Sequence, residues 1–141
     1  MKLLSIPALF SLLLSLYVPH TFAEEEGASV QKYIDLGEFK VNLKKGHLGA
    51  FKAQLYATSD LMEKMVKLHQ PRIKGTILNR FSMISIKQFS SKKKRRKTVK
   101  KILKEIRKRI LSFELPTADG EEQPLNPEDL RELLITSIIY Q

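Results

Sequence analysis

The feature that most constrains the fold of this chain is a strongly basic amphipathic segment, residues 90–113. It contains 12 of the chain's 25 Lys and Arg residues and a single acid, Glu105. At a helical angle of about 100° per residue, its apolar residues fall in one stripe roughly 100° wide. The stripe consists of Val99, Ile102, Leu103, Ile106, Ile110 and Phe113. The segment therefore predicts a long helix whose apolar stripe must be covered by another element.

An unbroken run of six cations opens this segment: Lys92, Lys93, Lys94, Arg95, Arg96 and Lys97. Positive charge at the start of a helix opposes the helix dipole, whose amino-terminal end is itself positive. We therefore expect a cap at Ser90 or Ser91, a partly frayed cationic run, and regular helix from nearer Thr98. The six cations are candidate interaction residues.

Two alternating runs earlier in the chain predict a β-hairpin over residues 33–57. Apolar and polar residues alternate from residue 33 to residue 43, with an interruption at Gly37 that indicates a bulge. Alternation resumes over residues 51–57, after a turn that contains two glycines. Such a hairpin has one apolar face, which needs a helix to cover it.

Residues 60–83 have helical spacing and follow the hairpin. Asp60 is expected as the N-cap, with Glu63 three residues later as its capping-box partner. Pro71 would kink this helix or divide it into two abutting helices, because proline lacks the backbone N–H. Residues 83–89 are expected to form a connection.

The last apolar run, residues 133–140, reads LLITSIIY and is rich in β-branched residues without clean alternation. This pattern suits a strand that is buried on both faces or placed centrally in a sheet. The chain therefore predicts an α+β fold, in which a small antiparallel or mixed sheet packs against two or three helices. The hairpin 33–57 and the strand 133–140 would form that sheet.

The first 23 residues are typical of an export signal. Lys2 precedes an apolar run over residues 3–18, and small residues at Thr21 and Ala23 predict cleavage between Ala23 and Glu24. The alternative is an uncleaved membrane anchor, although a membrane-spanning helix needs about 20 apolar residues. Residues 24–31 would then be a flexible lead to a folded domain over residues 32–141.

Export changes the interpretation of the charge. The formal net charge is +10, and twelve cations lie within residues 92–109, so the rest of the chain is nearly neutral. A basic patch often binds nucleic acid, but an exported protein rarely meets it. An anionic membrane surface, an envelope polymer or an acidic protein face is the favoured partner. A solvated surface without a partner remains the alternative.

No catalytic or metal-binding pattern is present in the sequence. The chain has no Cys, and neither His47 nor His69 has a second ligand at a helical spacing. No nucleophile motif or phosphate-binding loop occurs. We therefore expect no enzymatic activity, cofactor, metal or small-molecule substrate. Pro71 and Arg72 are further candidate interaction residues, since Arg72 would anchor a partner or cap carbonyl groups.

The order of these segments resembles the flagellar basal-body-associated FliL family over residues 32–141. The most specific pieces are Pro71-Arg72-Ile73 followed by Ile77-Leu78, and the apolar strand ending at Gln141. The resemblance implies a periplasmic domain with a stomatin-like fold and no catalysis. It also implies self-association around the stator units of the flagellar motor, and support of rotation.

Two features depart from the family. Its members usually have a cytoplasmic lead and a true transmembrane helix, whereas the apolar run here starts at residue 3 and ends in a cleavable-looking site. Where the family often opens its long helix with a glycine and mixed charges, this chain has Ser90-Ser91 and a solid basic run. The expected location is the periplasm, either free or anchored at the inner membrane.

Overall fold

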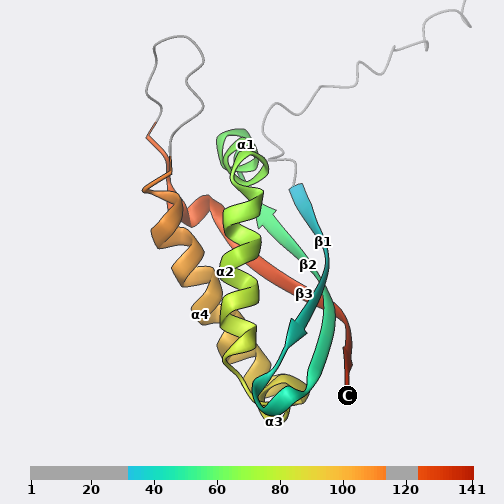
Figure 1. Ribbon diagram of the computed structural model, residues 1–141. Helices are drawn as coiled ribbons and strands as arrows, with labels where there is room; N and C mark the ends of the chain where they lie inside the picture. The colour runs from blue at the N-terminus through green and yellow to red at the C-terminus, as the bar shows by residue number, and fades with distance from the viewer. Residues whose placement is uncertain (1–31, 114–123) are drawn as a thin grey trace, which may run out of the picture.

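The structure, a computed structural model, describes residues 32–113 and 124–141 as one antiparallel sheet with four helices (Figure 1). This confirms the predicted α+β class. The strands are β1 (Lys32–Asn42), β2 (Leu48–Ala57) and β3 (Leu130–Tyr140), and the helices are α1 (Asp60–Leu68), α2 (Gln70–Ser82), α3 (Ile86–Ser90) and α4 (Lys92–Ile110). The predicted signal, its cleavage point at Ala23 and Glu24, and the lead 24–31 lie outside the described residues.

The first two strands form the predicted hairpin, with the expected bulge at Gly37. The register between β1 and β2 shifts between Asp35 and Gly37. Gly37 has a φ of 81°, a left-handed conformation that glycine adopts without steric cost. Its N–H donates to the carboxylate of Asp35 at 2.8 Å. The residues on either side of the bulge keep their apolar side chains on the same, buried face of the sheet.

The third strand is an edge strand, so its prediction as a doubly buried or central strand is wrong. The strand order is β1-β2-β3, with β2 in the middle. Ile139 is 67% exposed and Tyr140 is 48% exposed. The β-branched composition that indicated a buried strand reflects strand propensity, which serves an edge strand equally well.

A bulge explains why this strand lacks alternation. Ile135 pairs with Ala53 and Thr136 with Lys52, but the next pair is Ile139 with Ala50. Ser137 and Ile138 therefore both lie opposite Phe51, and Ser137 has a φ of 52°. Two residues opposite one shift the side-chain pattern by one position. Local periodicity cannot reveal this shift, because it depends on pairing with β2.

The predicted helix over residues 60–83 is divided at His69 into α1 and α2, and Pro71 lies in the first turn of α2. The N-cap of α1 is Ser59 rather than Asp60, and its hydroxyl accepts from the N–H of Met62 at 3.2 Å. Residues 83–89 are not only a connection, because α3 forms there. A capping box between Ser85 and Gln88 starts this short helix.

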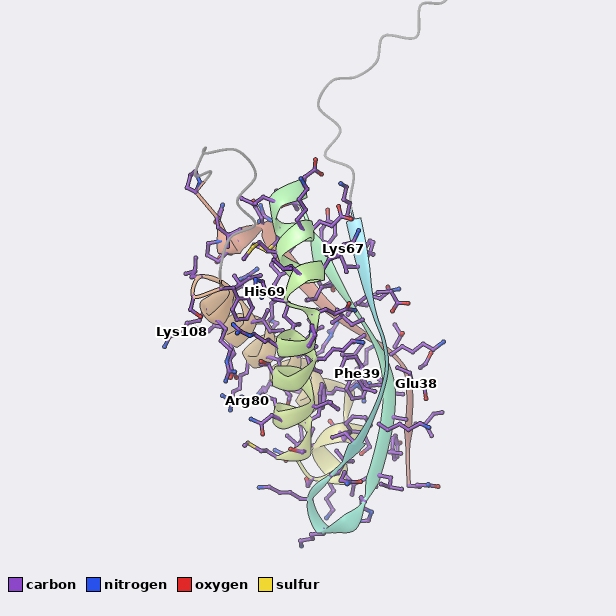
Figure 2. The ribbon with its side chains drawn as sticks, turned by 45° about the horizontal axis from the view of Figure 1, so that its top comes forward. Glu38, Phe39, Lys67, His69, Arg80 and Lys108 are labelled. Carbon is purple, nitrogen blue, oxygen red and sulfur yellow. The ribbon has the colours of Figure 1, made fainter. Side chains whose placement is uncertain are left out.

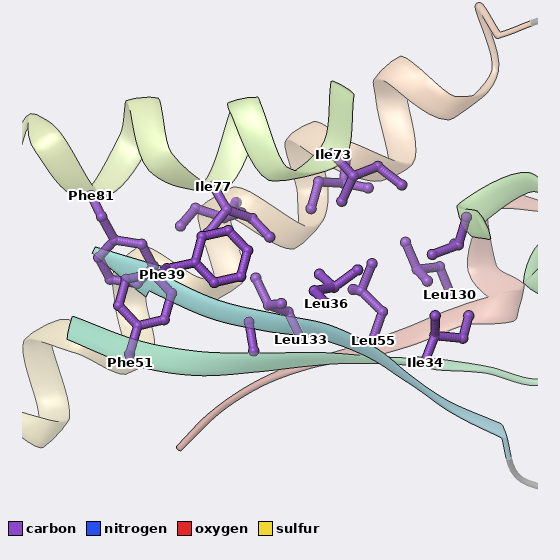
Figure 3. Packing of buried hydrophobic residues seen from close by; sticks show 14 of the residues in the cluster. Ile34, Leu36, Phe39, Phe51, Leu55, Ile73, Ile77, Phe81, Leu130 and Leu133 are labelled. Atoms are coloured by element: carbon purple, nitrogen blue, oxygen red, sulfur yellow. The ribbon is translucent and has the colours of Figure 1, made fainter. Parts of the chain in front are cut away.

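The core lies between one face of the sheet and the helices α2 and α4, which run side by side across that face (Figure 1). Phe39 points from β1 toward α2, whereas Glu38 points to the opposite side of the sheet (Figure 2). Fully buried Phe51 is the centre of an aromatic cluster (Figure 3). Its ring centroid lies 5.0 Å from Phe39, 4.7 Å from Phe81 and 6.0 Å from Phe89. This cluster joins two strands to α2 and α3.

Replacing Phe51 by alanine is expected to lower the free energy of unfolding by about 3–5 kcal/mol, because a buried ring is lost and a cavity remains. Urea denaturation followed by circular dichroism measures this change. Leu48→Ala in the same strand is the control, since Leu48 is 47% exposed. The Leu48→Ala change is expected to lower the free energy of unfolding by only about 0.5 kcal/mol, as is typical of surface positions. Equal costs for both variants would contradict the assigned core.

Candidate functional site

The apolar stripe of the basic helix is covered by the sheet and by α2, as predicted. Ile102, Ile106 and Ile110 are almost completely buried. The remaining stripe residues pack against the same core as partly buried side chains: Val99, Leu103 and Phe113. This face of α4 is used for folding. The cationic back of the helix is exposed to solvent, and Val99 and Leu103 stay partly exposed at the margin of the stripe.

Helix α4 begins at Lys92, so the expectation of a frayed run with regular helix from Thr98 is wrong. The Ser91 hydroxyl accepts from the N–H of Lys94 at 3.4 Å, and the Ser91 carbonyl accepts from the N–H of Arg95 at 2.8 Å. An N-cap contributes about 1 kcal/mol, while each unfavourable charge in the first turn costs about 0.3–1 kcal/mol. The cations of this turn together can therefore cost more than the cap alone contributes. Lys and Arg are also good helix formers, and the buried apolar face of α4 adds tertiary packing. Together these contributions outweigh the dipole.

Arg95 differs from the other five residues of the run. Its guanidinium donates to the carbonyl oxygen of Phe89 at 2.6 Å and to that of Ser90 at 3.3 Å. These carbonyls lie at the end of α3, where no further helical turn donates an N–H to them. Arg95 therefore ties α3 to α4. The exposed members of the run are Lys92, Lys93, Lys94, Arg96 and Lys97.

The charge of these exposed residues is not neutralised within the part of the chain that the structure describes. The ion pairs of α4 there join Glu105 to Arg80 and Arg109, and Arg107 to Glu128. None of them involves residues 92–97. The first two turns of α4 therefore present a concentrated positive surface.

Glu105, the single acid of α4, links this helix to α2. Its carboxylate pairs with Arg80 of α2, which projects from that helix in Figure 2, and with Arg109 at 2.7 Å. The hydrogen bond from Arg80 is the main cause that lowers the pKa of Glu105 below its ordinary value of 4.5. Glu105 therefore fixes the two helices rather than tuning the basic surface.

Pro71 and Arg72 lie far from the basic run and do not share a surface with it. Both are exposed in the first turn of α2, and the Arg72 guanidinium lies 5.5 Å from the centre of the Phe113 ring. The His69 ring also packs on Phe113, with centroids 4.5 Å apart. Phe113 follows the carboxyl end of α4, whereas the run opens that helix. The 13 residues of helix from Lys97 to Ile110 alone span about 20 Å, so the two candidate sets lie at opposite ends of α4.

A groove between α4 and β3 was not predicted from the sequence. Its volume is about 910 Å³. One side is the amino-terminal half of α4, and the other is the beginning of β3, including Arg131 and Leu133. No local sequence pattern indicates that Arg131 belongs to this groove, because only the tertiary fold brings it near α4. Partly buried Val99 and Leu103, at the margin of the apolar stripe, are the one hint that the sequence offers.

Other classes of site find no support in residues 32–113 and 124–141. No three His, Asp or Glu side chains gather there in a way that would hold a metal ion. None of the helices in these ranges combines the length and hydrophobicity needed to cross a membrane.

Glu105→Gln is expected to lower the free energy of unfolding by about 1 kcal/mol at pH 7, since it removes two partly exposed ion pairs. Because the pKa of Glu105 is lowered in the folded protein, its stabilisation is complete above pH 4.5 and is lost as the pH falls through the folded-state pKa. The difference between wild type and variant should therefore shrink in acid. Urea denaturation at pH 7, 5, 4 and 3 measures it, and a difference independent of pH would contradict this role.

The comparison with known families agrees with the resemblance seen in the sequence. Residues 33–141 match the model of the family described as flagellar basal body-associated protein FliL. No match is found among curated proteins. The matched range starts in β1 and ends after β3, so it includes the sheet, all four helices and the basic surface. The chain therefore belongs to the FliL family of flagellar basal body-associated proteins.

Proposed function

We propose that this protein is exported to the periplasm and acts there as a non-enzymatic accessory of the flagellar motor. It associates with the basal body or the stator and supports flagellar rotation. The observation that carries this proposal is the family match over residues 33–141. The signal-like residues 1–23 support export, and the exposed cations of α4 provide a surface for an acidic partner.

Exposed apolar residues support self-association as part of this function. Tyr33 and Tyr56 stack on the sheet face away from the helices, with ring centroids 5.0 Å apart. Leu48 and Ile139 are exposed on the same face. The two pairs lie near opposite ends of this face, and exposed apolar groups of this kind often mark a contact between proteins. A homo-oligomer would cover part of this face.

Deletion of the gene is expected to reduce swimming speed in viscous medium, where the motor works under high load, and the wild-type gene should restore it. Fractionation of the restored cells should find the protein in the periplasm and in basal-body preparations. Mass spectrometry should place its amino terminus at Glu24 if the signal is cleaved. Unchanged swimming together with absence from basal bodies would contradict the proposed function.

A second candidate function is binding to an anionic membrane surface or envelope polymer through α4. The observation that favours it is the row of five exposed cations without a described acidic partner: Lys92, Lys93, Lys94, Arg96 and Lys97. Each cation near an anionic membrane contributes about 1 kcal/mol. In this function the protein would be peripheral to the membrane.

Changing these five residues to glutamine, with Arg95 kept for its structural bonds, should abolish sedimentation with phosphatidylglycerol vesicles. The wild type should also dissociate above roughly 0.3 M salt, where screening acts over less than 10 Å. The matched control replaces five exposed lysines elsewhere: Lys40, Lys44, Lys52, Lys64 and Lys87. An equal loss in both variants would show that overall charge, not the α4 surface, binds the membrane.

A further inference from the structure

We propose that the groove between α4 and β3 binds an extended, acidic segment of a partner protein, which adds to the sheet as a fourth strand beside β3. The inference concerns this surface alone. It does not depend on the flagellar role or on which component of the cell envelope supplies the segment.

The free edge of β3 provides the backbone part of the site. Alternate N–H and C=O groups of an edge strand point away from its single neighbour. In the described ranges, β2 is the only strand that pairs with β3. Residues 132–136 pair with β2 in regular register, between one irregularity near Leu130 and the bulge at Ser137. These five residues form a short, regular edge beside which an additional strand can pair.

The shape of the groove suits an extended chain. Its lining runs along α4 from Lys92 to Leu103, about 16 Å at the helical rise. It also runs along β3 from Arg131 to Ile135, about 13 Å at the rise of a strand. Both lengths correspond to four or five residues of a strand. Val99, Leu103 and Ile135 give the groove partly buried apolar contacts, so alternate residues of the added strand would be apolar.

The charge of the groove selects an acidic segment. Lys92, Arg96, Lys100 and Arg131 are exposed at its rim, and among the described residues that line it Glu132 is the only acid. Within the described residues none of these four cations forms an ion pair. Carboxylates on the added strand would supply the missing partners and raise its rate of association.

The probe for this proposal is a fluorescently labelled ten-residue peptide of alternating Val and Glu, with binding followed by fluorescence anisotropy. Arg96→Glu with Lys100→Glu should weaken binding at least about tenfold, since two rim cations are reversed. Lys94→Glu with Lys101→Glu is the matched control, because these residues lie on the same helix but outside the groove. Its effect should stay within about twofold, as expected of charges that make no contact. Equal weakening by both pairs would overturn the proposal.

A second measurement tests strand addition itself. Two peptides are compared, one N-methylated at the odd residues and the other at the even residues. Each lacks the N–H donors on one side of the strand, and the peptide that lacks the donors facing β3 should fail to bind. Amide hydrogen exchange of residues 132–136 should slow when the unmodified peptide binds. Full binding by both methylated peptides would overturn the proposal. The absence of binding by the unmodified peptide would also overturn it. If both variant pairs then weaken vesicle binding equally, the surface is assigned to a membrane.

Discussion

The structure depends on covering one apolar face of a three-stranded sheet. Sheets of this size have a single layer, and their apolar face must pack against helices to be removed from water. Here α2 and α4 lie on that face, and Phe51 contacts aromatic rings from β1, α2 and α3. The three isoleucines of α4 are buried in the same layer of the core. The fold therefore determines which side of the basic helix meets solvent.

The two sides of α4 differ sharply in burial and charge. The buried side of α4 holds Ile102, Ile106 and Ile110, while the exposed side holds most of its lysines. Charged residues cross this division. Arg95 bonds to carbonyls of α3, Glu105 pairs with α2, and Arg107 donates to the carbonyl of Leu130, so all three serve the fold. A charged residue on this helix cannot be assigned to function from its charge alone.

Much of the fold could be predicted from periodicity, because alternation and helical spacing report directly on burial. The hairpin, the Gly37 bulge and the apolar stripe of α4 were all correct for this reason. The errors involve competition between local and distant interactions. The start of α4 depends on the cap at Ser91 together with helix propensity and the packing of its apolar face, which outweigh the dipole. The place of β3 at the edge depended on pairing that no local pattern records. Of the candidate site, the cations were visible in the sequence, but the groove beside them was not, since it forms only where α4 meets β3.

The interruptions at Gly37 and Ser137 have a consequence for how copies of this protein behave when crowded. A long, flat and unprotected strand edge is a template for open-ended stacking of chains into fibres. Each outer strand here has an irregularity, one in β1 and one in β3. Neither edge therefore offers more than six consecutive residues in register. The irregularities shorten the template that another copy could extend, so fibre growth along these edges is disfavoured.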